Sequence, residues 1–285
     1  MRIVRWLGVA LGILAAVVLV ALTVAYGAAE YLLRQTSDVR AAAVDIPTDP
    51  ASVAEGQRLS MVHGCVGCHG PALQGNLLFD EPLIATIPAP NVADSMRRYS
   101  VGDIVTAMRQ GVHPGTGRTM MVMPSQAFAP LTDTDLGRIL AYVASLPPTA
   151  AVEGSVSIGP VGRVGLLAGK YKTSLQLVRQ AVAPPEAADA TAAQGRYLAR
   201  TSCAQCHGAD LAGASHPEGD APNLRVVAGY SPEAFSRLMK TGIGVGDRKL
   251  GVMTGWAKAY LSYFTDDEVQ SLYRYLHEMP QAAPH

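Results

Sequence analysis

The sequence carries the pattern Cys-x-x-Cys-His twice, as Cys65-Val66-Gly67-Cys68-His69 and as Cys203-Ala204-Gln205-Cys206-His207. These two stretches contain all four cysteines of the 285-residue chain. Four cysteines in an exported protein would ordinarily suggest disulfides. The histidine that directly follows each pair changes that interpretation, because a disulfide has no use for it.

Each residue of the pattern matches one requirement of a covalently bound haem. Two thiols on a helical turn face the two vinyl groups of the porphyrin and form thioethers, and the next histidine reaches the iron. A redox-active cysteine pair or a zinc site is the alternative, but neither explains a histidine in the same place twice. We therefore predict two covalently bound haem c groups. The predicted attachment residues and proximal iron ligands are Cys65, Cys68, His69, Cys203, Cys206 and His207.

The residues around the two patterns repeat as well. A glycine precedes each pattern, Leu-x-Gly and Ala-Pro-Asn follow it, and each copy closes on a helix with a tyrosine ten residues after a threonine. The paired positions are Gly56 and Gly195, Leu73 and Leu211, Pro90 and Pro222, Thr132 and Thr265, and Tyr142 and Tyr275. We therefore predict two homologous modules, at residues 46–148 and 191–282, joined by a connector at residues 149–190.

Signals for helix starts recur in both modules. In a capping box, a hydroxyl and an acid or amide three residues later satisfy free backbone amides. The predicted boxes are Ser52 with Glu55, Thr191 with Gln194, and Thr265 with Glu268. Ser231 followed by Pro232 predicts a further helix start. Because no segment shows the convincing alternation that is typical of strands, we expect an all-α fold.

The connector has proline-containing ends and an apolar middle with scattered basic residues. We interpret residues 161–182 as one amphipathic helix. Such a helix either holds the two modules in a fixed register or lies on a membrane surface. We favour the first interpretation.

The first 35 residues differ from the rest of the chain. The run from Trp6 to Ala29 has 24 residues and no charge, whereas an apolar helix needs about 20 residues to span a bilayer. Arg2 and Arg5 precede it, so the positive-inside rule places the modules in the periplasm. The alternative is a cleaved signal peptide, whose apolar stretch is usually about 7 to 15 residues long. We expect residues 1–35 to form a retained, single-pass anchor in the inner membrane.

Acidic and basic residues balance, with 23 of each kind. The chain therefore has no field of one sign that would attract nucleic acid or a strongly charged partner. The partners that we expect are the membrane and a redox protein, such as a dehydrogenase subunit, an oxidase or a soluble cytochrome.

The coordination position of each iron opposite the histidine distinguishes an electron carrier from an enzyme, because an enzyme needs this position open. A methionine closes that position and raises the reduction potential. In the second module, Met253 lies 12 residues before Thr265. Met253 is the predicted ligand there, in preference to a role as core filling.

In the first module, three methionines lie close together. Met123 precedes Pro124 and follows a valine, as Met253 also does, and it is the predicted ligand. An ungapped alignment of the closing helices favours Met120 instead. Met120 and Met121 are therefore alternatives to Met123 as the iron ligand of the first module, and His113 is a further alternative.

With these features the chain resembles a tandem of class I cytochromes c. It is similar to the membrane-anchored c-type subunits that serve bacterial alcohol, aldehyde and sugar dehydrogenases, although the best-known of these carry three haems. The resemblance implies that the carbonyls of Pro90 and Pro222 hold the second ring nitrogen of the two histidines. It also implies that the first and last helices of each module cross at a glycine and an aromatic residue. The residues at these crossings are Gly56 with Tyr142 and Gly195 with Tyr275.

The expected function is the transfer of single electrons in the periplasm, between a dehydrogenase or quinol-oxidising partner and a downstream acceptor. The chain would be an electron carrier or a subunit, and not itself an enzyme. The rival is a dihaem enzyme of the cytochrome c peroxidase type, which needs one iron with an open or displaceable far side. Of the remaining residues, we expect His63 at the surface and Trp256 packed near a haem.

Overall fold

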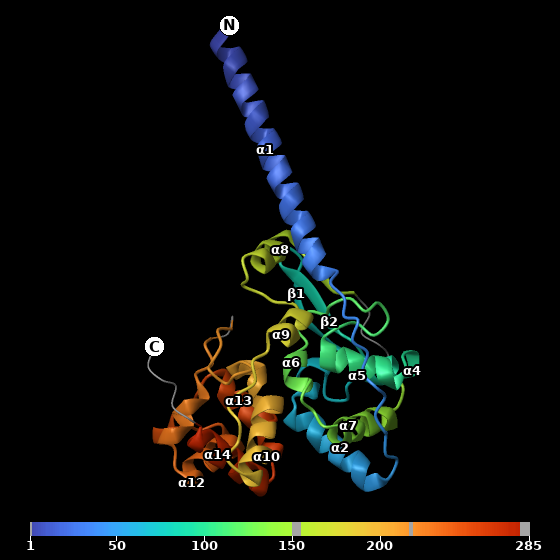
Figure 1. Ribbon diagram of the computed structural model, residues 1–285, viewed down its shortest axis with the longest axis vertical. Coiled ribbons are helices and arrows are strands. Elements are labelled where there is room, and N and C mark those ends of the chain that lie inside the picture. Colours follow the sequence, from blue (N-terminus) through green and yellow to red (C-terminus); the bar gives the residue numbers. More distant parts are fainter. Residues whose placement is uncertain (1, 150–154, 217–218, 280–285) are drawn as a thin grey trace.

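The structure, a computed structural model, describes residues 2–149, 155–216 and 219–279. A long helix, α1 (Arg2–Leu33), extends away from a body of two helical lobes (Figure 1). The fold is mostly helical, as predicted. The start of the predicted connector, residues 150–154, and the end of the predicted second module, residues 280–282, lie outside the described residues.

The first lobe consists of short helices around an apolar core. They are α2 (Pro50–Val62), α3 (Cys65–His69), α4 (Val92–Arg98), α5 (Val101–Gln110), α6 (Ser125–Phe128) and α7 (Asp133–Ser145). Apolar residues recur on one face of α5 and of α7, so that Val105 and Leu140 are buried in the same cluster. This core supports the two loops that flank α3.

The second lobe repeats this plan. It consists of α10 (Ala190–Leu198), the π-helical turn η1 (Ala199–Cys203), α11 (Ala204–His207), η2 (Leu224–Gly229), α12 (Pro232–Thr241), η3 (Val245–Asp247), α13 (Val252–Ala259), η4 (Leu261–Tyr263) and α14 (Asp266–Glu278). Leu272, Leu276 and Phe264 are almost fully buried in its core.

The first and last helices of each lobe cross at a glycine. A Cβ atom at Gly56 would lie 1.8 Å from the Arg138 carbonyl oxygen and 3.1 Å from Tyr142 Cβ. A Cβ atom at Gly195 would lie 2.0 Å from the Ser271 carbonyl oxygen and 2.7 Å from Tyr275 Cβ. The predicted crossings are confirmed, and only glycine permits so close an approach.

The predicted helix starts were half right. Thr265 forms a capping box with Glu268, and Ser231 caps α12. Ser52 and Thr191 are not caps, because Asp49 and Asp189 start α2 and α10 earlier in the chain. Their carboxylates accept hydrogen bonds from the backbone amides of Ser52 and Ala192, respectively.

The first lobe also carries a small antiparallel sheet, which the sequence did not predict. It consists of β1 (Asn76–Glu81), β2 (Ala85–Ala89) and β3 (Ser157–Ile158), in the order β1-β2-β3. A register shift between Leu77 and Phe79 interrupts the pairing of β1 with β2. Together with Pro88 inside β2, this bulge hides the alternation by which strands are recognised.

The prediction of one connector helix over residues 161–182 was wrong. Two short helices, α8 (Pro160–Leu167) and α9 (Ser174–Gln180), take its place. Gly169 adopts a φ of 69° after α8, and Thr173 then starts α9 with its own capping box. α8 lies beside α1, and α9 packs on α5 and α6.

Among the described residues, α1 is the one helix that is long and apolar enough to cross a membrane. Nearly all of its side chains are exposed. A signal sequence near the N-terminus passes the same test of length and composition.

Candidate haem sites

The first candidate site is centred on α3, which carries Cys65, Cys68 and His69 on a single turn. Gly64 and Gly70 flank this turn with φ values of 70° and 83°, a conformation that costs glycine little. In the second site the chain arrives from α10 through η1, which ends at Cys203, and α11 ends at His207. Gly208, with a φ of 79°, then turns the chain away.

The cysteines have the surroundings of structural thiols and not of redox thiols. None of the four, all of which lie in the described part of the chain, takes part in a disulfide. Burial raises the pKa of the Cys65 thiol to about 12 and that of the Cys203 thiol to about 12 as well. A redox-active Cys-x-x-Cys motif instead has a lowered thiol pKa, so this alternative does not fit the sites.

Each histidine of the pattern is fixed by a proline carbonyl. His69 Nδ1 lies 2.8 Å from the Pro90 oxygen, and His207 Nδ1 lies 2.7 Å from the Pro222 oxygen. Burial lowers the pKa of both imidazoles, so each neutral ring donates its Nδ1 proton to the carbonyl. Nε2 is then left with the lone pair that an iron ligand needs. These are the hydrogen bonds that the resemblance implies.

The loop after each histidine has the same unusual backbone in both lobes. Leu73 and Leu211 have φ values of 54° and 62°, in the left-handed region that residues other than glycine rarely adopt. Both leucines are almost completely buried. The amides of Gly75 and Gly213 bond to the carbonyls of His69 and His207, at 2.7 Å and 2.9 Å. The internal repeat therefore extends to the backbone around the sites.

The methionines occupy different local structures in the two lobes. Met253 is partly buried near the start of α13, against the core of the second lobe. Met123 follows Val122, whose φ is 72°, and packs on the core of the first lobe. Met120 is held through its backbone, because its amide bonds to Gly111 O and its carbonyl accepts from Ser174 N. We keep Met123 and Met253 as the proposed ligands.

His113, the alternative ligand, is exposed. Its Nδ1 accepts hydrogen bonds from the backbone amides of Gly115 and Thr116, at 3.1 Å and 3.3 Å. Its ring meets Tyr99 edge-on, with 5.9 Å between the ring centroids. These contacts give His113 a structural role within its own loop.

Paired thiols and a neutral imidazole with its Nδ1 proton committed form a donor set that suits a c-type haem. A family model for cytochrome c matches residues 53–147 and 192–280, which together make up more than half of the chain. The chain belongs to the cytochrome c family. The two matched regions fall on the two lobes.

Curated relatives are cytochrome subunits of dehydrogenases. The chain is 23% identical over 271 residues to the fructose dehydrogenase cytochrome subunit of Gluconobacter japonicus, covering 83% of this chain and 56% of the relative. It is 24% identical over 270 residues to the alcohol dehydrogenase (quinone) cytochrome c subunits of Gluconacetobacter polyoxogenes and Komagataeibacter europaeus, covering 83% of this chain and 58% of each relative. The chain thus spans about half the length of the curated relatives that it matches.

His63 lies in the contact between the two cytochrome c lobes, and the prediction that it is exposed was wrong. The side chain is only 1% exposed. Its Nδ1 lies 3.2 Å from Thr201 O and 3.1 Å from Ser202 Oγ, and its carbonyl accepts a hydrogen bond from Gln205 Nε2 at 2.9 Å. The chain just before the first Cys-x-x-Cys-His segment therefore contacts the start of the second segment and the residues that lead into it. The sequence contained no sign of this, because the neighbours of His63 are about 140 residues away along the chain.

Aromatic residues of the second cytochrome c lobe complete this contact. A Cβ atom at Gly64 would lie 2.7 Å from the Trp256 ring, and one at Gly67 would lie 2.9 Å from Tyr260 Oη. The two aromatic rings meet edge to face, with 4.4 Å between their centroids. Trp256 of α13, the helix that carries Met253, and Tyr260 directly after this helix thus pack on the first attachment segment and on Gly64 before it.

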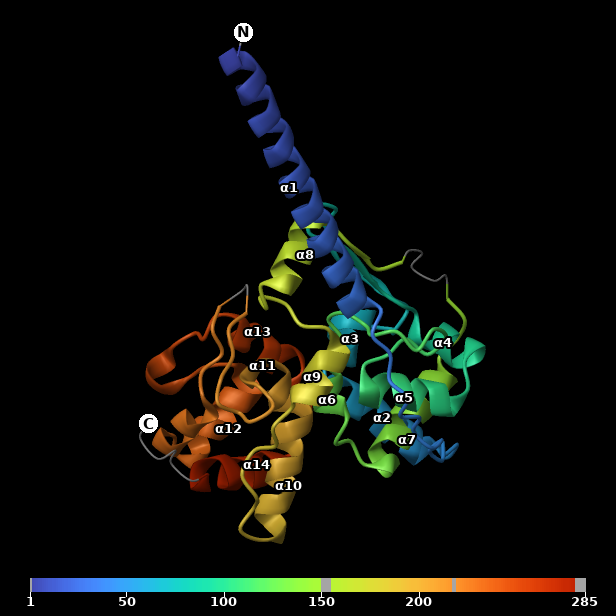
Figure 2. The same ribbon diagram turned by 45° about the horizontal axis from the view of Figure 1, so that its top comes forward.

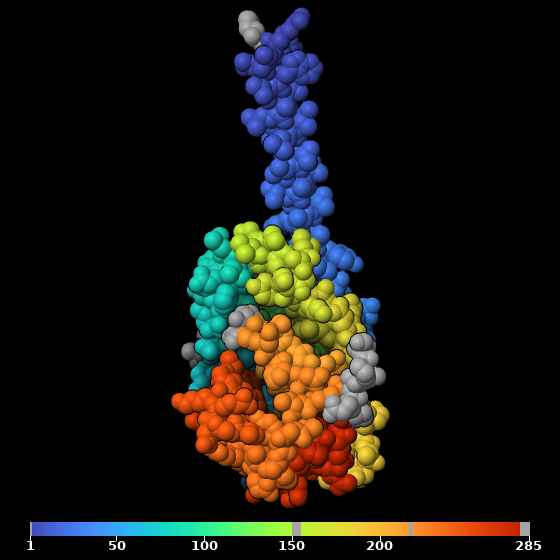
Figure 3. All heavy atoms as spheres, turned by 90° about the vertical axis from the view of Figure 1, so that its left-hand side faces the viewer, coloured from blue at the N-terminus to red at the C-terminus, as the bar shows by residue number. Residues whose placement is uncertain are grey.

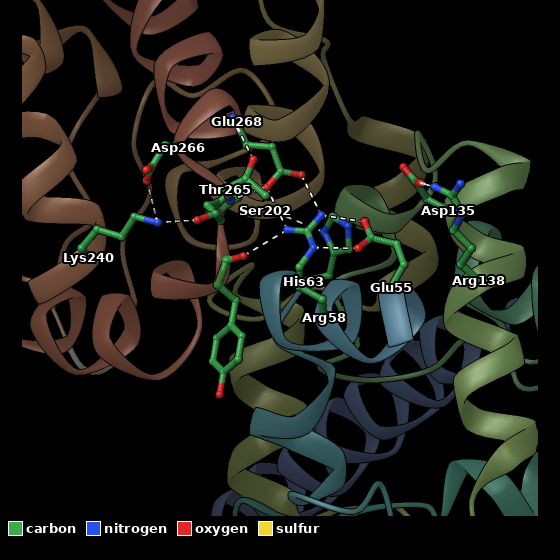
Figure 4. A network of polar contacts seen from close by, with 12 residues as sticks. Glu55, Arg58, His63, Asp135, Arg138, Ser202, Lys240, Thr265, Asp266 and Glu268 are labelled. Carbon is green, nitrogen blue, oxygen red and sulfur yellow. Dashed lines mark hydrogen bonds and ion pairs between the residues drawn. The ribbon is translucent and has the colours of Figure 1, made fainter. Parts of the chain in front are cut away.

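An ion-pair network at the edge of the contact joins the lobes (Figure 4). Arg58 binds Glu55 of its own lobe at 2.7 Å and Glu268 of the other lobe at 2.8 Å, and it donates to the Tyr263 carbonyl. The Arg58 side chain is 21% exposed and that of Glu268 is 12% exposed. These two carboxylates raise the pKa of the Arg58 guanidinium above its ordinary value.

Replacing Arg58 by methionine is expected to lower the free energy of unfolding by about 1 to 3 kcal/mol, because Glu55 and Glu268 lose their shared cation while partly buried. Chemical denaturation followed by circular dichroism measures this loss. Arg237→Met is the control, because its partner Asp247 is 80% exposed and such a pair contributes about 0 to 1 kcal/mol. Equal effects of the two substitutions would contradict the role of Arg58 at the contact.

The contact between the lobes is expected to weaken in acid. Burial lowers the pKa of His63 to about 4, although Thr201 O, Asp135 and Glu268 favour its protonation and Arg58 opposes it. In the unfolded chain the histidine titrates near its ordinary pKa of about 6.5. The unfolded state therefore binds more protons between these pH values, and the stability present above about pH 6.5 is lost as the pH falls towards 4.

The expected contribution of His63 to this loss of stability is at most about 3 kcal/mol. Denaturation curves measured over this range should show a smaller loss of stability in His63→Gln than in the unaltered chain. An identical pH dependence of the two proteins would exclude His63 as the cause.

Proposed function

We propose that this chain is a dihaem cytochrome c, held in the inner membrane by α1, that passes single electrons on the periplasmic side. The observation that carries the proposal is the pair of Cys-x-x-Cys-His segments, each with a proline carbonyl on its histidine, and with Gln205 of the second bonded to His63 just before the first. The domain limits at 46–148 and 191–282, the connector at 149–190 and the anchor at 1–35 belong to this proposal.

In this proposal each lobe holds its haem in the same way. Cys65 and Cys68 would attach the haem of the first site, and His69 and Met123 would be the ligands of its iron. The corresponding residues of the second site are Cys203, Cys206, His207 and Met253. When bound, each haem supplies reversible one-electron chemistry. The Pro90 and Pro222 carbonyls fix the orientation of the two imidazoles and make them better ligands.

The contact between the lobes supports electron exchange within the chain. His63, which is 1% exposed, accepts a hydrogen bond from Gln205 of the second attachment segment, and Trp256 packs on Gly64 next to the first. The ion pairs of Arg58 hold the lobes in one arrangement. We infer that an electron received by one haem passes to the other without release of the protein from its partner.

A dehydrogenase subunit is the proposed electron donor, on the basis of the relatives that are cytochrome subunits of fructose and alcohol dehydrogenases. A quinol-oxidising partner is the alternative donor, and an oxidase or a soluble cytochrome is the proposed acceptor. Because the chain has no net charge, docking should act at short range and depend only weakly on salt.

Carbon monoxide distinguishes this carrier from a dihaem enzyme of the peroxidase type. Two irons closed by Met123 and Met253 should resist the gas, whereas an enzyme needs one accessible iron. We expect no rapid change in the spectrum when the reduced, full-length protein is mixed with carbon monoxide at neutral pH. Rapid binding by one of the haems would contradict the carrier function of that lobe.

A further inference from the structure

α8 lies alongside the end of α1 at the point where α1 joins the body (Figure 2). Arg163 of α8 makes this contact. Its guanidinium carbon lies 4.5 Å from the centre of the Tyr26 ring, and its Nη2 donates to Glu30 at 3.0 Å. The Arg163 side chain is only 17% exposed. α8 is therefore held at a fixed height along α1.

This height coincides with the end of the apolar part of α1. The run without charge begins at Trp6, and at a rise of 1.5 Å per residue the helix reaches Tyr26 after about 30 Å. The hydrocarbon core of a bilayer is also about 30 Å thick. Tyrosine is favoured at the boundary between lipid and water, so Tyr26, with α8 beside it, lies at that boundary.

The outward face of α8 is entirely apolar. At 100° per residue, four side chains of α8 and that of Ala168, the residue that caps its C-terminus, share this face, and all five are exposed. They are Pro160, Val161, Val164, Leu167 and Ala168. The one charged residue of the helix, Arg163, points to α1 instead. A helix that faces water carries polar residues on its outer side, and α8 has the opposite arrangement.

The tip of the β1–β2 hairpin extends this apolar surface. Leu83 is 68% exposed, and its carbonyl accepts a hydrogen bond from Val161 N at 2.9 Å. The Gly159 amide bonds to Ile84 O at 2.9 Å, which fixes the tip to the start of α8. We call these five residues together with Leu83 the α8 patch. Figure 3 shows the segments that carry it at the end of the body from which α1 emerges.

The charges next to the α8 patch suit the headgroup region. Lys170 and Lys172 follow α8 and are exposed. Long basic side chains of this kind reach the phosphates of lipids while their neighbours lie deeper. Glu81, two residues before Leu83, is also exposed, and its carboxylate must stay in water. The arrangement therefore suits a shallow position.

We propose that the α8 patch lies in the outer interface of the bilayer that α1 spans. This proposal rests on the anchoring by α1 in the proposed function. One helix across a membrane leaves the body free to tilt, whereas a second contact at the α8 patch holds it in one orientation. The two haem sites are then presented at a constant height to a partner in the same membrane.

Spin labels test this proposal in the full-length holoprotein. The variants Val164→Cys and Leu83→Cys are labelled and reconstituted into vesicles of phosphatidylcholine with a minority of phosphatidylglycerol. The haems are kept reduced. Collisions of each label with oxygen, which concentrates in lipid, are compared with collisions with a water-soluble nickel chelate. For both labels, we expect the ratio of oxygen collisions to nickel-chelate collisions to be severalfold higher than for the same labels in unfolded protein.

Two control positions separate the possible outcomes. Val226→Cys, at a side chain that is 53% exposed in the second lobe, should favour the nickel chelate. Leu14→Cys, in the middle of α1, should favour oxygen strongly. One outcome is that the label at position 14 lies in lipid while the label at position 164 favours the nickel chelate, as the label at position 226 does. The α8 patch then faces water or a protein partner, and our proposal is wrong. If label 14 also lies in water, the anchor itself is wrong and the proposal fails with it.

Discussion

Replacing Gly195 by alanine is expected to unfold the second lobe. The added Cβ atom would lie 2.0 Å from the Ser271 carbonyl oxygen and 2.7 Å from Tyr275 Cβ. Both are parts of α14 that cannot move without separating α14 from α10. We expect a loss on the order of 4 kcal/mol or more, which is close to the whole stability of a typical domain, about 5 to 15 kcal/mol. Thermal unfolding and limited proteolysis measure the effect.

Gly255→Ala is the matched control in the same lobe. A Cβ atom there would have no neighbour within 4 Å, and the residue lies inside α13. This substitution should leave the stability unchanged or raise it by about 0.5 to 1 kcal/mol, because alanine favours the helix. Equal stability of the two variants would show that α10 and α14 do not cross as closely as described.

Replacing Cys203 and Cys206 together by alanine is expected to remove one of the two covalent haems. Without the thiols no thioether can form in the second lobe, while the first site is unchanged. Mass spectrometry of the denatured chain should find one attached haem in this variant. The second lobe should also lose stability, because the haem that α11 would hold is then no longer attached to it.

Ser202→Ala is the control for this experiment. Ser202 directly precedes Cys203, and its hydroxyl lies 3.1 Å from His63 Nδ1, so its removal affects the contact between the lobes and not the attachment. This variant should keep both haems. If the double cysteine variant also kept both, the assignment of Cys203 and Cys206 would be wrong.

Features that depend on residues close together in the sequence were predictable. The pattern at Cys65–His69, its repeat at Cys203–His207, and the start of α14 at Thr265 each follow from local chemistry. The resemblance to class I cytochromes c added the hydrogen bonds of Pro90 and Pro222, which join residues about 15 to 21 positions apart. The iron ligation by Met123 and Met253 is still a proposal.

Features created by the meeting of the two lobes were not predictable. The sequence of the first module alone predicts His63 at the surface, but the second lobe covers it with Thr201, Ser202 and Gln205. Local competition explains the other errors. Asp49 and Asp189 start their helices before the predicted caps, Ser52 and Thr191. Gly169 divides a segment whose composition suggested one helix.

The haem content of the denatured, full-length chain tests the central claim most directly. The purified protein is unfolded, non-covalent groups are extracted, and the remaining porphyrin is quantified as its pyridine complex against the amount of polypeptide. Thioethers at both Cys-x-x-Cys-His segments predict two haems per chain. A ratio of one or of zero would contradict the account of this protein as a dihaem cytochrome c.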